Sequence, residues 1–174
     1  MSDVTILFGR PHVPQHAEDR FELEALAAEE FGIESYAIPL DPVVNGEPER
    51  ALRRLPQPRH RTWLYRGWML SEEEYTGLHE AMSERGEDLV VDPESFAEAT
   101  YVPSYAPLLG SHTTPTRWTE GEDIEEAWEA AQELGPPPWI VKDHVKSAKE
   151  LWHRACFVPE GAAREDFVYR AVLR

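Results

Sequence analysis

The sequence predicts an α/β fold for the first hundred residues, followed by a small part with helices and an antiparallel hairpin. Three observations support this prediction. Short apolar stretches alternate with helix-like stretches as far as Thr100, which favours a parallel sheet covered by helices. Proline, serine and threonine then become frequent, as is typical of a linker. Beyond the linker, two strand-like stretches enclose a lysine-rich loop.

Each strand expected in the first part is a short apolar run that ends near a turn-forming residue. Gly9 ends the first run, and Pro39 stops the second. The four strands are expected at residues 4–9, 33–39, 61–70 and 87–94. The helices are expected at residues 17–32, 48–55, 71–86 and 93–99.

Two helix ends carry capping signals. Ser71 is a favourable N-cap residue, and Glu74 three positions later completes a capping box. Leu70 and Tyr75 take the positions of a hydrophobic staple around that cap. Gly32 stands where the C-terminal cap of the first helix belongs.

The loop after the first strand has no GxGxxG pattern, so the sequence lacks a dinucleotide-binding fingerprint.

The second part begins after the expected linker, residues 101–121. Asp123 is expected to cap a helix that ends at Gly135. The apolar residues of this helix share one face, which predicts that this face is buried. They are Ile124, Ala127, Trp128, Ala131 and Leu134.

Strands are expected on both sides of the lysine-rich loop, at residues 139–143 and 151–161. The second strand is predicted from side chains that alternate around Arg154 and Cys156. Cys156 lies in apolar surroundings and is interpreted as a core residue rather than a nucleophile. A last helix is expected to begin near residue 163.

The composition bounds the class of protein. Among the 174 residues, 41% are hydrophobic and 29% charged, as in a globular domain. The net charge of −16 argues against nucleic acid or an anionic membrane as a general partner. The sequence contains no run of the ~18 apolar residues that a membrane span needs. It shows no signal-peptide pattern, and its single cysteine excludes a disulfide framework, so we expect a cytoplasmic location.

The lysines gather in one place. Lys142, Lys146 and Lys149 are the only three in the chain, and all other basic residues are arginines. Lysine is a compact charge that neutralises phosphate oxygens, and Ser147 adds a hydroxyl donor, so this loop suits a phosphate group. It is not a P-loop, because its glycines are missing. A solvated hairpin tip without a ligand remains the alternative. The seven histidines form no metal motif.

The motifs "YRGW", "TPT" and "P-WIVKDHVKSAKELWHRACFVP" resemble proteins of the ATP-grasp superfamily. Within it they look most like a bacterial and phage clade that has altered basic residues at the nucleotide site. The specific part of the resemblance is residues 138–159. It implies a Rossmann-like pre-ATP-grasp domain at residues 1–100, the linker at 101–121, and part of the small N-terminal ATP-grasp lobe at 122–174.

The resemblance also implies a nucleotide site. Lys142 matches the strand lysine that contacts ATP phosphates, and Lys146 and Ser147 fall in the loop that covers them. Arg66, at the end of the third strand, would face the site, although an ion pair near residues 72–74 is an equal alternative. Arg117 would be a second basic contact or a solvated linker residue. Trp68 is interpreted as core.

ATP and Mg²⁺ are the cofactors that the resemblance implies. In that family the magnesium ligands come from a larger C-terminal lobe, so this sequence is expected to represent the first half. The implied activity is ATP-dependent ligation of a small carboxylate to an amine or similar nucleophile, once such a lobe completes the site. The alternative is a binding or regulatory module, without catalysis, that docks a partner or another copy of itself.

Overall fold

A parallel β-sheet forms the centre of the first of two units in this computed structural model, which describes residues 4–10, 21–145 and 151–173. The units comprise Met1–Ala97 and Glu98–Arg174. The sheet has the strand order β2-β1-β3-β4, and each neighbouring pair is parallel. The prediction of an α/β unit with a parallel sheet is therefore confirmed. The strands are β1 (Val4–Arg10), β2 (Ser35–Pro39), β3 (Thr62–Arg66) and β4 (Asp88–Leu89).

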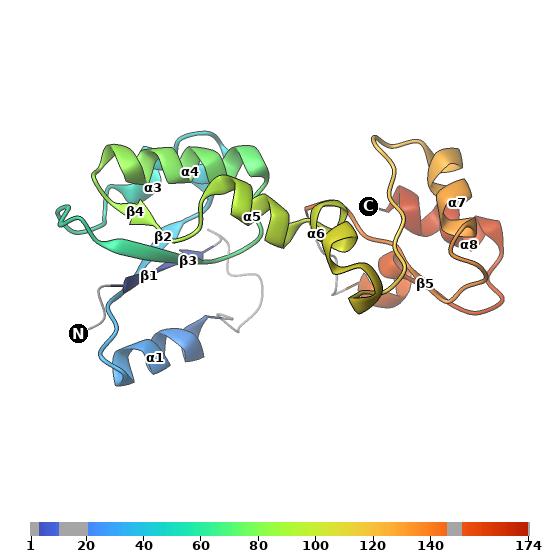
Figure 1. Cartoon of the computed structure of the whole chain (residues 1–174), viewed down its shortest axis with the longest axis horizontal. Helices are drawn as coiled ribbons and strands as arrows, with labels where there is room; N and C mark the ends of the chain where they lie inside the picture. The colour runs from blue at the N-terminus through green and yellow to red at the C-terminus, as the bar shows by residue number, and fades with distance from the viewer. Residues whose placement is uncertain (1–3, 11–20, 146–150, 174) are drawn as a thin grey trace. The chain divides into compact units, whose positions relative to one another are not determined.

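Helices lie on both faces of this sheet. Figure 1 shows α1 on one side, and α3 and α4 on the other. The first unit contains α1 (Glu22–Glu30), α2 (Asp41–Val44), α3 (Pro48–Leu52) and α4 (Glu72–Glu84), and α5 (Pro93–Thr100) follows. The short α2 was not predicted, and α3 ends three residues before the predicted end of its helix.

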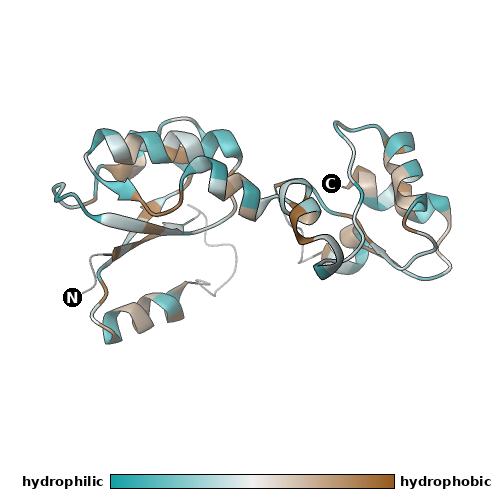
Figure 2. Ribbon diagram, in the orientation of Figure 1, coloured by the Kyte–Doolittle hydropathy of each residue, from teal (hydrophilic) through white to brown (hydrophobic). Residues whose placement is uncertain are grey.

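The main hydrophobic core lies on the α4 side of the sheet. Leu7, Ile38 and Trp63 come from three neighbouring strands, and Leu78 and Met82 come from α4. Each of the five is at most 1% exposed. Figure 2 shows β1 mostly in the brown of hydrophobic residues, whereas α4 alternates along its length. The amphipathic pattern of α4 thus closes one face of the sheet.

The capping signals around α4 and α1 are confirmed. The Glu74 amide donates to Ser71 Oγ over 3.2 Å, and the Ser71 amide donates to the Glu74 carboxylate over 2.7 Å. Leu70 and Tyr75 are both 1% exposed. Gly32 has a φ of +67°, the left-handed conformation that a C-terminal cap requires.

The second unit is built from short elements around a two-stranded sheet. β5 (Trp139–Ile140) and β6 (Phe157–Val158) pair antiparallel, with α7 (Ile124–Gln132) before them and α8 (Arg164–Val172) after them. Helix α6 (Val102–Leu109) occupies the first part of the predicted linker segment. The predicted N-cap of α7 is confirmed, because Asp123 accepts hydrogen bonds from the amides of Glu125 and Glu126.

The predicted strand at residues 151–161 is wrong for most of its length. Trp152–Cys156 forms a π-helical turn, and only Phe157–Val158 is a strand. The physical reason is a side chain from α8: Arg170 donates to the carbonyl of His153, within the turn, and to that of Phe157. Ala155 and Cys156 are also both buried, which an alternating strand would not allow. Burial of Cys156 agrees with its assignment to the core.

No helix in the described part of the chain is both long and apolar enough to cross a membrane.

Candidate functional site

Lys142 lies immediately after the hydrogen-bonded part of the hairpin. The ladder pairs Trp139 with Val158 and Ile140 with Phe157. Its last bond runs from the Val141 amide to the Cys156 carbonyl, over 2.8 Å. Lys142 is the next residue and is exposed. The predicted antiparallel pairing is therefore confirmed, but the strand predicted over residues 139–143 ends at Ile140, and Lys142 lies two residues beyond it.

An aromatic cluster anchors β5 to the flanking helices. The Trp139 ring meets Trp128 of α7 at 5.8 Å and Phe167 of α8 at 6.1 Å between ring centroids. Phe167 is 3% exposed and belongs to the core of this unit together with Val158 and Ala131. The Trp139 indole N–H also donates to the Gly135 carbonyl over 3.0 Å. The strand that leads to Lys142 is thus held on the helix pair by packing and by a hydrogen bond.

Arg170 anchors the other flank of the hairpin. Its side chain is 12% exposed, and Nε donates to the Phe157 carbonyl over 2.5 Å. Nη2 donates to the His153 carbonyl over 3.3 Å, and Nη1 donates to the Asp166 carbonyl. No sequence pattern predicts this role, because the contact joins side chain and backbone groups of separate elements.

Lys146 and Ser147, the other predicted phosphate-binding residues of this loop, lie outside the described residues. Lys149 does as well. Their predicted roles stay predictions.

Arg66 ends β3 in the first unit, and its guanidinium is engaged by a carboxylate. Nε and Nη2 donate to the two Glu24 oxygens over 2.6 and 2.9 Å. The hydrogen bond from Arg66 holds the pKa of Glu24 below its ordinary value and raises the pKa of Arg66. The ring of Phe21 lies 5.6 Å from the guanidinium carbon. The alternative prediction, an ion pair of Arg66 near residues 72–74, is thus wrong, because Glu24 of α1 supplies the carboxylate.

Trp68 is not a core residue: it is 41% exposed. Tyr65 explains this, because its ring packs against the core and its hydroxyl donates to the Trp68 carbonyl over 2.9 Å. A Cβ atom on Gly67 would collide with that hydroxyl, so the turn requires glycine. Burial raises the pKa of Tyr65 well above its ordinary value. The prediction that Trp68 is a core residue is therefore wrong, and Tyr65 of the same segment packs, partly buried, against the core instead.

Arg117 pairs with Glu133, and the Nε–Oε2 distance is 2.7 Å. Both side chains are about half exposed, so the pair contributes little to stability. The interpretation of Arg117 as only solvated is wrong, and its role as a second basic contact stays a prediction.

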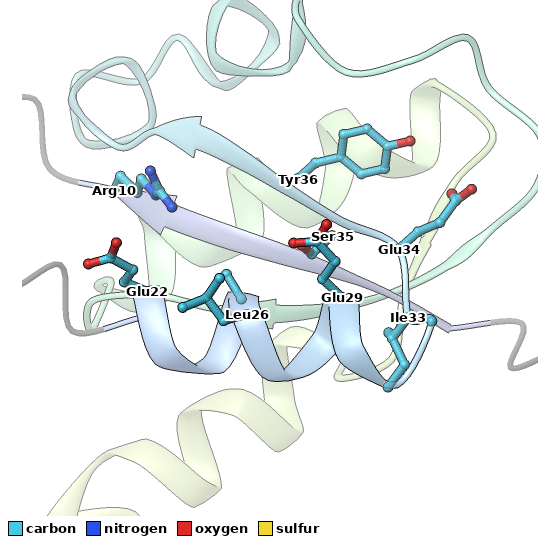
Figure 3. Close-up of a pocket in the computed structure, with 10 residues that line it drawn as sticks. Arg10, Glu22, Leu26, Glu29, Ile33, Glu34, Ser35 and Tyr36 are labelled. Atoms are coloured by element: carbon cyan, nitrogen blue, oxygen red, sulfur yellow. The ribbon is translucent and has the colours of Figure 1, made fainter.

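The first unit has an open hollow of about 580 Å³ between α1 and the edge strand β2. Figure 3 shows Glu22, Leu26 and Glu29 along it on α1. Glu34 and Arg10 also line it, so among the described lining residues three glutamates stand against one arginine. This charge balance disfavours a phosphate ligand. Arg66 and Lys142, the described residues of the predicted site, do not line the hollow.

The described residues contain no group of three His, Cys, Asp or Glu side chains that could hold a metal ion. They therefore offer no ligand set to assign to Mg²⁺. Lys142, by contrast, is an exposed lysine two residues beyond the end of β5, and a primary amine suits a phosphate oxygen.

Comparison with models of known protein families finds no match, and comparison with curated proteins finds no similar sequence.

Proposed function

We propose that this chain binds the phosphates of ATP at the β5–β6 hairpin and is the nucleotide-binding part of an ATP-grasp-like ligase. The observation that carries the proposal is the position of Lys142. It is exposed directly beyond the last ladder bond of a hairpin whose two flanks are anchored by Trp139 and by Arg170. The order of α7, β5, a π-helical turn, β6 and α8 supports it as well, because the sequence resemblance implies a small lobe with an antiparallel hairpin.

The charge distribution supports the same proposal. A chain with a net charge of −16 repels polyphosphate on average, so affinity requires a local cluster of cations. All three lysines stand between residues 142 and 149. ATP, when bound, supplies the phosphoryl group that activates a carboxylate for joining to an amine. Lys142 would orient the phosphates and neutralise their charge.

Arg66 has a weaker case than Lys142. A phosphate at Arg66 would compete with the Glu24 carboxylate, which already accepts two of its N–H groups. Its assignment as a phosphate contact therefore needs its own test.

Isothermal titration with Mg²⁺-ATP tests the proposal. Lys142→Ala is expected to weaken binding by at least roughly 10-fold, the scale of a charged hydrogen bond. Lys142→Arg keeps the charge but changes the geometry, so an intermediate affinity is expected. Arg164→Ala is the matched control, because it removes one partly exposed cation from the same unit. Arg66→Gln tests the second contact in the same assay.

Equal affinity in the wild type and in Lys142→Ala would contradict the proposed contact. A regulatory role without catalysis predicts the same Lys142-dependent binding but no ATP turnover with any small carboxylate and amine. A ligase predicts turnover once its magnesium-binding residues are supplied.

A further inference from the structure

The imidazole of His144 stacks on the ring of Tyr101 in the second unit. The ring centroids lie 4.3 Å apart, and the planes differ by 23°. Tyr101 is 2% exposed and directly precedes α6, whereas His144 is exposed. The buried ring of Tyr101, at the start of α6, thus holds the segment that follows β5.

Lys142 lies between two fixed points. On one side the Val141 amide is bonded to the Cys156 carbonyl at 2.8 Å, and β5 continues into the aromatic cluster at Trp139. On the other side the chain is held by the ring of His144. The backbone at Lys142 therefore has little freedom to reorient. A contact that is held in place before the ligand arrives costs less entropy on binding.

We propose that His144 is a positioning residue for Lys142: its stack on Tyr101 holds the lysine in the orientation that meets the nucleotide phosphates. This inference rests on the proposed function and deepens it, because it names a residue that acts through the phosphate contact. His144 itself makes no contact with the phosphates in this proposal. It stabilises the backbone of the bound state through its aromatic contact with Tyr101. His144 is close to Lys142 in sequence, whereas Tyr101 is distant from it.

Titration of the full chain with Mg²⁺-ATP tests this role with two replacements at one position. His144→Ala removes the ring, whereas His144→Phe keeps a flat ring that can lie on Tyr101. Neither replacement carries a charge, so the difference between them reports stacking and not electrostatics. His112→Ala is the control, because it removes another exposed histidine from the same unit.

The expected loss for His144→Ala is roughly 2- to 10-fold in ATP affinity, the range that an aromatic pair can contribute. His144→Phe is expected to return to within about 2-fold of the wild type, and His112→Ala to match it. In a Lys142→Ala background, His144→Ala should cause no further loss. Thermal unfolding of each variant shows whether the fold is kept.

The outcomes separate the two proposals. Wild-type affinity in His144→Ala, beside a loss in Lys142→Ala, would overturn the positioning role alone. A loss in His144→Ala that Phe does not restore would overturn stacking as its cause. Binding that does not depend on Lys142 at all would overturn the proposed function, and the positioning role with it.

Discussion

Glu87 is a buried carboxylate that accepts three N–H hydrogen bonds at the start of β3 and β4. Its donors are the backbone amides of Arg61 at 2.6 Å and Arg59 at 3.0 Å, and the Trp63 indole at 3.0 Å. Glu87 is 1% exposed. Burial alone would raise its pKa, but the hydrogen bonds from Trp63, Arg61 and Arg59 and the charge of Arg61 hold the pKa below its ordinary value. The carboxylate therefore ties the loop before β3 to the sheet.

Glu87→Gln is expected to lower the free energy of unfolding at neutral pH by about 2 kcal/mol, since an amide cannot accept from all three donors. The folded protein binds the Glu87 proton more weakly than the unfolded chain does. The stabilisation is therefore present above the ordinary pKa of 4.5 and is lost as pH falls through the lower folded value. Urea unfolding measured between pH 7 and pH 3 checks both effects.

Glu84→Gln is the matched control for this measurement, because Glu84 is exposed near the end of α4. The account of Glu87 fails if the two variants are equally stable at pH 7. It also fails if the wild type and Glu87→Gln lose stability in parallel on acidification.

Single-residue roles were the hardest to predict from sequence. Arg66 meets Glu24, and Arg117 meets Glu133, across separations that no local pattern encodes. Trp68 is expected in the core because it is a large apolar residue, yet it is exposed, and Tyr65 packs against the core instead. The chain has 33 acidic residues, so each arginine has many candidate partners. Which carboxylate it meets depends on the tertiary structure, which local sequence patterns do not predict.

The π-helical turn Trp152–Cys156 depends on a side chain from another element. Arg170 of α8 donates to two carbonyls at this turn and at the start of β6, His153 and Phe157. Because the arginine satisfies these carbonyls, they need no N–H donor from a partner strand. The ladder between β5 and β6 is accordingly only two residue pairs long. The element therefore has its shape because α8 packs beside it.

Arg170→Met is expected to destabilise the second unit by about 2 kcal/mol. It removes the donor to the partly buried Phe157 carbonyl and to the exposed His153 carbonyl while keeping most of the apolar stem. Faster hydrogen exchange is expected at the amides of Val141 and Phe157. Arg154→Met is the control, since Arg154 is an exposed arginine of the same turn. Unchanged exchange in Arg170→Met would show that the arginine does not hold the hairpin flank.

Elements with local signals were predicted well, and elements without them were not. Ser71 and Asp123 capped their helices as expected, because a cap is satisfied by residues two or three positions away. The strand at residues 151–161 failed because alternation in sequence was outweighed by the contact from Arg170. Helix α2, with Pro42 in its first turn, was missed since four residues carry no periodicity.

At the scale of the whole molecule, two units each have their own hydrophobic core. The first is centred on Trp63 and Leu78, and the second on Val158 and Phe167. Alternating strands and helices predicted the first unit and its parallel sheet, because such alternation allows few other arrangements. The candidate site was predictable only as far as Lys142 and its hairpin. Its anchors, His144 on Tyr101 and Arg170 on β6, come from contacts between distant segments.

The central claim is that the phosphates of ATP lie beside Lys142. An ATP derivative with an acyl group on its terminal phosphate tests this directly, because an adjacent lysine amine attacks the acyl carbon and releases ATP. The chain has only three lysines, so mass spectrometry of the digested protein assigns the acylated side chain unambiguously among them. We predict acylation of Lys142 that excess Mg²⁺-ATP suppresses. Acylation that excess ATP leaves unchanged, or none at Lys142, would contradict the account.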